Sequence, residues 1–526
     1  MRKYQICFFL LAYCLGISAA YSAAQVMGYF PAWSRVPVSE MVRDGTMVAE
    51  DVTVIHYAFL AICWDGVHGN PDVAGDDSDA DALVRPCQDG NGVANHAPNG
   101  SIVLSNPALD SVFGGSGLNH LGQLLGLKER NPHLKLVASV GGWTGSDRFS
   151  IMARNAVTRN NFVSSAIVFL RAYHFDGIDI DWEFPGAIGL PCSPSRLCQS
   201  ESDKHNYLLL IQSLRAALDQ AGDEDGKHYV ISIAAGAMPS FLENSKSELS
   251  RVPGQNKSTL PRLNLQSPAV HQQPVEENWL RTLSASLDWV TLMNYDYHGP
   301  WDPSSGLIAP MGFDVRDPNA SANAGFGTAM IEQFLKHVPA HKLLLGMALY
   351  GYGWSECAAG IWGDGLYQPC LGGGLDPSVL DFSRIDVGID SLRHTEMRVA
   401  DVFPSSFAPC DQLAQSMQLR QLIVGQEDGA VTLAGLVDWS LIRMDEFGKY
   451  TVGRCGFRRY WNRAAQLPYL YNPTSKLFIT YEDELSIHNK NQAILFYGLG
   501  GAMLWQLALD RHHILGGVVS HDLLGK

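Results

Sequence analysis

One stretch of the chain reads Phe175-Asp176-Gly177-Ile178-Asp179-Ile180-Asp181-Trp182-Glu183-Phe184-Pro185-Gly186. Side chains alternate along a β-strand, so Asp179, Asp181 and Glu183 share one face, about 6.6 Å apart at each step. The apolar residues between them face the other way, so the acidic face is expected to point into the interior of a barrel, where unpaired carboxylates are costly. The proline and glycine end the strand, which places Glu183 at its mouth.

The spacing of these carboxylates predicts a shared proton. Like-charge repulsion in such a row raises the pKa of at least one acid, so that one group stays protonated. A carboxylic acid that is protonated near neutral pH is what a glycosidase needs to protonate a leaving oxygen. A solvated acidic strand is one alternative, but it leaves the apolar residues unexplained. An oxygen-rich metal site is the other alternative.

Short apolar, β-branched runs recur along the chain, and most are followed by a helix-like pattern. The predicted strands are 26–30, 52–60, 135–140, 177–183, 229–235, 289–295, 343–349 and 500–506. Helix candidates between them include 118–129, 159–173, 207–221 and 329–337. Strands that are apolar on both faces are typical of buried parallel sheets. The pattern predicts an α/β fold, a closed (β/α)8 TIM barrel with its reactive groups at the C-terminal strand ends.

The spacing of the strands is uneven, and the longest gap indicates an insertion. About 110 residues, 355–468, separate the seventh strand from the segment that leads into the eighth, enough for a small α+β domain. We therefore expect a catalytic domain over 25–526 with an insertion domain at 355–468, which forms one wall of a cleft.

The first residues predict a secretory signal, 1–24, rather than part of the fold. Arg2 and Lys3 precede an apolar run over 6–17, which small residues follow up to Ala24. The run is too short to span a bilayer. We expect cleavage near Ala24 and a secreted protein, extracellular or periplasmic, with a retained N-terminal anchor as the alternative.

Charge and cysteine content limit the partners and the compartment. The chain has 38 basic and 53 acidic residues, a net charge of −15, which repels nucleic acid and anionic membranes and suits a neutral substrate. Eight of its ten cysteines follow the predicted signal, and an even number in an exported chain favours disulfides. Cys192 and Cys198 are the expected local pair. No paired C-x-x-C spacing indicates a zinc site, and we expect no metal.

The motif at 176–183 resembles the signature of glycoside hydrolase family 18, the chitinases and their relatives. The resemblance extends over about 26–510. Four further motifs resemble those of the family: Ser139-Val140-Gly141-Gly142-Trp143, Met293-Asn294-Tyr295-Asp296, Leu349-Tyr350-Gly351 with Trp354, and Gly500-Gly501-Ala502-Met503-Leu504-Trp505. Asp-Trp-Glu-Phe-Pro-Gly and the long insertion are most similar to the bacterial-type, deep-cleft chitinases.

The resemblance implies a substrate-assisted, retaining hydrolysis of β-1,4 bonds between N-acetylglucosamine units. Glu183 is then the acid, and the nucleophile is the carbonyl oxygen of the substrate's own acetamido group. Asp181 holds the acetamido N–H, and Asp179 beneath it shares a proton. Tyr295 holds the acetamido oxygen in line. The catalytic set that the resemblance implies is Glu183, Asp181, Asp179, Asp176 and Tyr295.

The same resemblance implies a sugar-binding set around these acids. Its members are Tyr29, Phe59, Ser139, Gly142, Trp143, Met293, Asp296, Trp301, Tyr350 and Trp505. Trp505 is expected under the distorted sugar, and Trp143 on the leaving-group side. The expected partners are chitin or N-acetylglucosamine oligosaccharides, bound by a monomer without a cofactor.

Two positions depart from the family pattern. Tyr352 stands where many relatives carry arginine, and Gln506 stands where an acidic residue is common. Both bear on contacts to the substrate rather than on the chemistry. Two other functions on the same scaffold are alternatives: a chitin-binding lectin, and an endo-β-N-acetylglucosaminidase that cuts the core of glycans.

Overall fold

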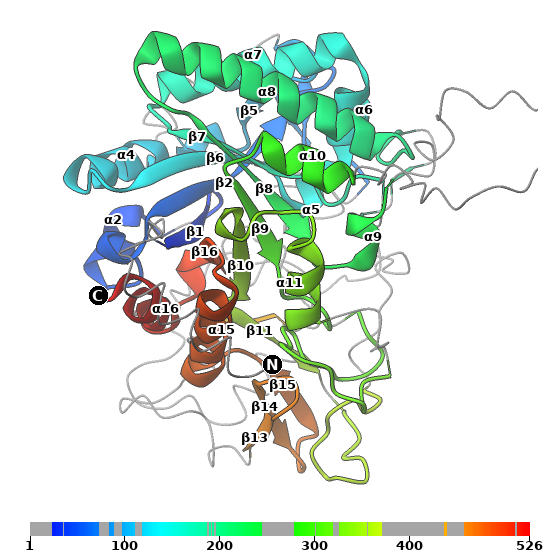
Figure 1. Ribbon diagram of the computed structural model, residues 1–526. Coiled ribbons are helices and arrows are strands. Elements are labelled where there is room, and N and C mark those ends of the chain that lie inside the picture. The colour runs from blue at the N-terminus through cyan, green and yellow to red at the C-terminus, as the bar shows by residue number, and fades with distance from the viewer. Residues whose placement is uncertain are drawn as a thin grey trace, which may run out of the picture.

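The structure is a computed structural model of the chain, shown in Figure 1. It describes residues 24–34, 36–72, 84–88, 97–110, 118–186, 189–190, 192–193, 196–244, 278–299, 301–318, 326–354, 356–370, 436–438, 457–510 and 513–526. The predicted secretory signal lies outside the described residues, apart from Ala24 at its end.

Within these residues, eight parallel strands close into a barrel (Figure 1). They are β1 (Gln25–Pro31), β2 (Val54–Ile62), β6 (Lys135–Gly141), β7 (Gly177–Asp181), β8 (Val230–Gly236), β9 (Trp289–Met293), β10 (Leu343–Ala348) and β16 (Gly501–Trp505). The order around the barrel is β1-β16-β10-β9-β8-β7-β6-β2, and β1 also pairs with β2. Each strand overlaps a predicted one, and the predicted TIM barrel is confirmed.

Helices cover the outside of the barrel (Figure 1). The longer ones are α4 (His120–Arg130), α7 (Ala156–Ala172), α8 (Asp203–Asp225), α10 (Trp279–Ala285), α11 (Thr328–Phe334), α15 (Glu484–Tyr497) and α16 (Ile514–Leu524). Shorter helices are α2 (Val38–Arg43), α3 (Pro107–Asp110), α5 (Gly142–Gly145), α6 (Phe149–Arg154) and α9 (Pro239–Leu242). Three short strands, β3 (Val67–His68), β4 (Arg85–Pro86) and β5 (Ile102–Leu104), lie in the segment after β2.

Capping residues, rather than the apolar pattern, fix where the predicted helices begin and end. The side chain of Asn119 accepts from the N–H of Gly122, so α4 begins at His120. Asn155 accepts from the N–H of Val157, which starts α7 three residues before the predicted position. Helix α8 ends before Gly226, whose φ of 68° is readily adopted by glycine.

The barrel strands are buried on both faces, as parallel strands covered by helices are. All residues of β8 and β10 are buried, for example. The outer faces pack against the helices, while the lumen combines apolar side chains with a few polar ones. The buried polar side chains of β2, β6, β7 and β8 are His56, Ser139, Asp179, Asp181 and Ser232. The barrel therefore encloses a polar group within an apolar core.

A second, antiparallel sheet follows β10 and returns before α15 (Figure 1). Its strands are β11 (Tyr350–Trp354), β12 (Leu436–Asp438), β13 (Arg458–Asn462), β14 (Leu467–Asn472) and β15 (Leu477–Thr480), in the order β12-β11-β15-β14-β13. The sheet uses residues on both sides of the predicted insertion, 355–468. Residues 371–435 and 439–456 lie outside the described residues. The division into domains therefore stays a prediction.

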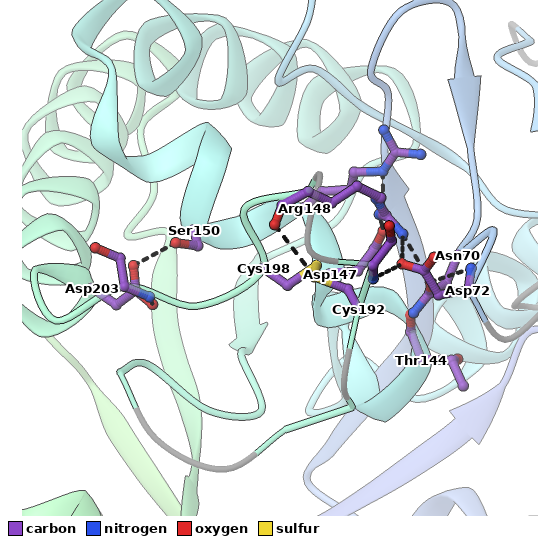
Figure 2. Close-up of a disulfide and its surroundings, with 12 residues drawn as sticks. Asn70, Asp72, Thr144, Asp147, Arg148, Ser150, Cys192, Cys198 and Asp203 are labelled. Carbon is purple, nitrogen blue, oxygen red and sulfur yellow. Dashed lines mark hydrogen bonds and ion pairs between the residues drawn. A yellow bond between two sulfur atoms is a disulfide. The ribbon is translucent and has the colours of Figure 1, made fainter. Parts of the chain in front are cut away.

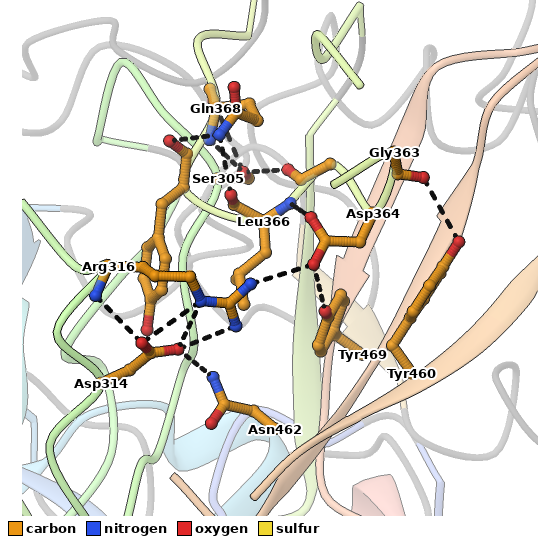
Figure 3. Close-up of polar contacts among 12 residues, drawn as sticks. Ser305, Asp314, Arg316, Gly363, Asp364, Leu366, Gln368, Tyr460, Asn462 and Tyr469 are labelled. Atoms are coloured by element: carbon orange, nitrogen blue, oxygen red, sulfur yellow. Dashed lines mark hydrogen bonds and ion pairs between the residues drawn. The ribbon is translucent and has the colours of Figure 1, made fainter. Parts of the chain in front are cut away.

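This sheet is fastened to the segment that follows β9. Arg316 bridges Asp314, 2.9 Å away, and Asp364, 3.1 Å away, and Tyr469 of β14 donates to Asp364 (Figure 3). The backbone N–H of Ser305 donates to the carbonyl of Gln368 at 3.0 Å. The second sheet is thus fixed to the loop that connects β9 to α11.

Three disulfides lie in the described part of the chain: Cys63–Cys87, Cys192–Cys198 and Cys357–Cys370. The predicted local pair is therefore confirmed. Cys410 and Cys455 lie outside the described residues. Among the described helices, none combines the length and the apolar character that crossing a membrane requires.

Candidate active site

Asp179 lies in the middle of β7, fully buried inside the barrel. Its two register partners, Ser139 on β6 and Ser232 on β8, each donate a hydrogen bond of 2.7 Å to it. The hydroxyl of Tyr29 on β1 donates a third, at 2.9 Å. Three strands thus supply donors to one buried carboxylate, which satisfies it without a positively charged partner.

Asp181 is the last residue of β7, two residues closer to the mouth of the barrel, and it is 4% exposed. Its Oδ1 is buried and has no hydrogen-bond partner among the described residues. Burial, and then the negative charges of Glu183 and Asp179, raise the pKa of Asp181 well above its ordinary value. Asp181 is therefore a group that takes up a proton readily and can accept a hydrogen bond at Oδ1.

Glu183 lies in the turn after β7, because the strand ends at Asp181 and not at 183 as predicted. The last pair between β7 and β8 joins Ile180 to Ile233, and the last pair with β6 joins Asp181 to Gly141, after which the backbone leaves the sheet. The N–H of Glu183 donates to Oγ of Ser146 at 2.8 Å, which fastens the turn. The side chain is half-buried. Burial, and then the negative charge of Asp296, raise the pKa of Glu183 to about 8, so Glu183 is protonated at neutral pH.

Tyr295 and Asp296 follow the end of β9. Burial, and then the charges of Asp181, Asp296 and Glu183, raise the pKa of Tyr295 well above its ordinary value. The Tyr295 hydroxyl therefore stays a donor, and it faces the acids of β7. Among the described residues, the Tyr295 hydroxyl contacts the sulfur of Met503, 3.8 Å away.

Asp296 adopts a left-handed backbone conformation, with φ 61°, and keeps an exposed surface. Its Oδ1 accepts a 2.6 Å hydrogen bond from the hydroxyl of Tyr350, and Tyr352 is a second donor. Although its surface reaches solvent, the walls of the site displace much of the water around it. This desolvation raises the pKa of Asp296 to about 6, and the two tyrosine donors oppose the shift. At neutral pH Asp296 is thus an anion beside the protonated Glu183.

Aromatic rings line the site on the side of β1, β2 and β16. The rings of Phe59 and Trp505 stack, with centroids 5.6 Å apart, and Tyr29 lies 5.2 Å from Trp505. Gly142 is required beside them, because a Cβ there would lie 2.4 Å from the ring of Phe59. Stacked rings of this kind offer an apolar floor next to Asp179.

The remaining predicted binding residues lie at the same end of the barrel. Trp143 is on α5, directly after β6, and is 36% exposed. Met293 ends β9 and packs in the lumen cluster with Tyr295 and Trp505. Trp301 lies in the loop after β9, and its ring contacts that of Tyr352 at 5.4 Å between centroids.

Asp176 is the one member of the predicted catalytic set that the structure does not bring to the others. It precedes β7, at the opposite end of the strand from Glu183. Its carboxylate pairs with Lys128, 2.6 Å away, and accepts from the N–H of Leu136 at 2.8 Å. These contacts fasten α4 to the start of β6 and β7, which is a structural role.

Sequence reasoning missed several residues of the site. Ser232 lies within the predicted strand 229–235, in phase with Asp179, but serine on a strand carries no signal of its own. His56 Nε2 lies 3.2 Å from the Ser232 hydroxyl, and burial lowers the pKa of His56, so it is neutral. Ser146 and Trp33 were also missed; the Trp33 ring lies 6.1 Å from that of Phe59.

Among the described residues, one group has the spacing of metal ligands: Asp72, Cys192 and Cys198. The two sulfurs are bonded to each other, so neither is a thiolate that could bind an ion. Asp72, drawn with the two cysteines in Figure 2, instead pairs with Arg196. This group therefore does not fit a metal.

Comparisons with known proteins agree with this arrangement. The sequence profile described as Glycosyl hydrolases family 18 matches residues 25–510. Chitinase A1 of Niallia circulans is 33% identical over 513 residues, which cover 95% of this chain and 58% of the relative. Chitinase A of Pseudoalteromonas piscicida is 26% identical over 488 residues, 89% of this chain and 48% of the relative. This chain thus spans about half the length of these curated relatives.

A solved structure is also similar. Chitinase ChiA74 from Bacillus thuringiensis superimposes with a TM-score of 0.69 at 29% identity, covering 96% of this chain and 70% of that one. The profile match begins with β1, at residue 25, and ends at residue 510, just after the short helical turn (Leu507–Leu509) that follows β16. It therefore includes every strand of the barrel. From the matched profile and the barrel that carries Asp179, Asp181 and Glu183, we conclude that this chain belongs to glycosyl hydrolase family 18.

Proposed function

We propose that the protein is a chitinase, which hydrolyses β-1,4 bonds between N-acetylglucosamine units with Glu183 as the proton donor. One observation carries the proposal: a protonated Glu183 lies beside Asp181, whose Oδ1 is buried and lacks a hydrogen-bond partner in the part of the chain that the structure describes. A buried acceptor without a donor is unfavourable, and the N–H of a substrate acetamido group supplies that donor. The names of the similar proteins, which are chitinases, point the same way.

The proposed first step breaks the bond between C1 and the glycosidic oxygen. Glu183 gives its proton to that oxygen, which leaves with the bonding electron pair. The carbonyl oxygen of the acetamido group of the same sugar attacks C1 and closes a positively charged oxazolinium ring. Asp181 passes its proton to Asp179 and accepts a hydrogen bond from the acetamido N–H, and its negative charge then stabilises the ring.

Tyr295 and Asp179 support this step in different ways. The Tyr295 hydroxyl donates to the acetamido oxygen and holds it in line with C1, which is a positioning effect. Asp179 shares a proton with Asp181, and the hydrogen bonds from Ser139, Ser232 and Tyr29 fix its orientation. Trp505 stacks under the reacting sugar.

The second step returns the enzyme to its first state. Water attacks C1 from the side that the leaving group has vacated, and the carboxylate of Glu183 takes the water proton. The C1–O bond of the ring breaks, which restores the acetamido group, and the product keeps its configuration at C1. The chain therefore needs no second carboxylate as nucleophile, and the substrate must carry an acetyl group on the reacting sugar.

Hydrolysis of a labelled chito-oligosaccharide by wild type and Glu183→Gln tests the proposal. We expect the variant to keep its affinity for the oligosaccharide and to lose at least about 10²–10⁴-fold in kcat, because the leaving oxygen has no proton donor. Equal turnover by the two proteins would overturn the role of Glu183. Binding without turnover by the wild type would indicate a lectin instead.

We also propose that the protein is exported and acts as a monomer. Three disulfides among the described residues support an oxidising compartment. The N-terminus of protein recovered from the culture medium or periplasm, and its mass in solution, test both points. We expect a start just after Ala24 and the mass of one chain; recovery only in the cytoplasm, or a dimer, would contradict them.

A further inference from the structure

The site is a cluster of acids without a basic partner. Asp179, Asp181, Glu183 and Asp296 make no ion pair with any lysine, arginine or histidine in the described part of the chain. The groups that act on Asp181 and Glu183 through their charge are other carboxylates: Glu183 and Asp179 on the first, Asp296 on the second. A cation that enters this site therefore meets no positively charged side chain among the described residues.

Tyr352, an uncharged residue, lies beside Asp296. It is 1% exposed, and its ring lies edge-on to both Tyr350, at 5.5 Å, and Trp301, at 5.4 Å. Its hydroxyl donates to the carboxylate of Asp296, as that of Tyr350 does. Two neutral donors thus hold Asp296, and they leave its negative charge uncompensated. A carboxylate has about four acceptor positions, so two donors leave room for a third.

We propose, on the basis of the proposed function, that the enzyme prefers partly deacetylated chitin in which the sugar on the leaving-group side of the cleaved bond is glucosamine. The ammonium group of that sugar pairs with the exposed carboxylate of Asp296.

The chemistry of the reaction decides on which side the amine is accepted. The reacting sugar must keep its acetyl group, because the acetamido oxygen is the nucleophile and Asp181 and Tyr295 hold it. The leaving sugar has no such requirement. Glu183 contacts the oxygen that joins the two sugars, and Asp296 is close enough to raise the pKa of Glu183 while it keeps a surface open to solvent. Asp296 is therefore in place for the sugar beyond the cleaved bond.

The preference depends on pH in a way that Asp296 sets. The titratable groups that face it are Tyr350 and Tyr352 from β11, Tyr295 beside it, and Glu183 after β7. The tyrosines and Glu183 are uncharged at neutral pH, so the charge seen by the amine is that of Asp296. Its pKa is raised to about 6, so Asp296 is an anion above that pH and is neutral well below it.

Digestion of partly acetylated chitosan oligomers, with the new chain ends identified by mass spectrometry, tests the inference. At about pH 7 and low salt we expect glucosamine at the new non-reducing end to be enriched about 5-fold over random cleavage, the effect of one exposed ion pair. The enrichment should disappear at about pH 5, where Asp296 is protonated, and in about 0.5 M salt, which screens the pair. Equal or lower use of glucosamine under all conditions would overturn the inference.

Two variants at one position supply the matched control. Tyr352→Phe removes a hydroxyl and adds no charge, so the enrichment should remain. Tyr352→Arg adds a cation beside Asp296, so the enrichment should be lost; an arginine variant that keeps it contradicts the inference. If the arginine variant does not fold, the pH and salt series on the wild type decide. Fully acetylated oligomers separate the two proposals, because failure to cleave them contradicts the chitinase proposal itself, whereas cleavage without a glucosamine preference contradicts only this inference.

Discussion

Ser232 on β8 donates a 2.7 Å hydrogen bond to Oδ1 of Asp179, its register partner on β7. Ser139, the register partner on the other side, donates a bond of the same length to Oδ2. Two serines thus clamp one buried carboxylate from both neighbouring strands. The position of Asp179 beneath Asp181 is therefore set by the pairing of three strands.

Replacing Ser232 with alanine removes one of the three donors to Asp179. A hydrogen bond to a charged group contributes about 1.5–3 kcal/mol, and loss of the donor leaves a buried acceptor unpaired. We expect the free energy of unfolding to fall by about 2 kcal/mol and kcat to fall about 10-fold, measured by urea unfolding and steady-state kinetics. Ser139→Ala should behave alike, whereas Ser213→Ala, which removes a hydroxyl bonded to a backbone carbonyl of α8, should change kcat little. A wild-type kcat in Ser232→Ala contradicts the clamp.

The pH dependence of kcat/KM should report Glu183. Its pKa is raised to about 8, by burial first and then by Asp296, and Glu183 acts as an acid only while it is protonated. We expect kcat/KM to fall as the pH rises through about 8. Asp296→Asn removes the negative charge next to Glu183, so its alkaline limb should move to lower pH. An alkaline limb that does not move would show that Asp296 does not act on Glu183.

Asp176→Asn should lower the stability of the fold and leave the rate of catalysis nearly unchanged. The variant loses the ion pair with Lys128 and one acceptor for the N–H of Leu136. Both contacts are partly shielded from water, because the Asp176 side chain is 17% exposed. We expect the free energy of unfolding to fall by about 1–2 kcal/mol, with kcat within about two-fold of wild type. Lys128→Met should destabilise the protein similarly. A large loss of kcat in a folded Asp176→Asn protein would instead show that Asp176 takes part in catalysis.

Arg196 should matter more for stability than an exposed arginine. It lies inside the Cys192–Cys198 loop and pairs with Asp72 and with Asp147, whose side chain is 4% exposed. We expect Arg196→Ala to lower the free energy of unfolding by about 2 kcal/mol at neutral pH. Burial already raises the pKa of Asp147, and loss of Arg196 raises it further, so the deficit should shrink as the pH falls and Asp147 takes up a proton.

Arg43→Ala is the control for this variant. Arg43 makes only an exposed pair with Glu40, 3.6 Å away, so its removal should change stability by less than about 0.5 kcal/mol. Equal unfolding midpoints for the two variants would show that Arg196 contributes no more than a surface charge.

The barrel could be predicted because its strands are apolar on both faces and recur along the chain. The second sheet could be predicted only in outline. Strand β11 begins two residues after β10 ends, and both are fully buried, so the sequence shows one apolar run over 343–354 where the structure has a change of sheet. The return strands β14 and β15 likewise lie around and beyond residue 468, where the predicted insertion ends.

The site also contains some residues that the sequence predicts and others that it does not. Asp179, Asp181 and Glu183 follow from a period of two along one segment. Asp176 is three residues from Asp179, so it has the opposite parity and lies at the other end of the strand, which membership in the motif does not reveal. Ser232 and Ser146 contact their partners across 53 and 37 residues of sequence. Serine is common, and only the folded chain brings these hydroxyls to the acids.

The double pairing of β1 has a consequence for the order in which the protein is made. Gln25–Pro31 leaves the ribosome before the other seven barrel strands, yet one of its two neighbours, Gly501–Trp505, is the last of the eight to emerge. Until then β1 and β10 each present an unpaired edge, which can join the edge of another nascent chain. The barrel therefore cannot close until its final strand has been synthesised. Truncation before residue 501 should give chains that aggregate rather than a smaller enzyme.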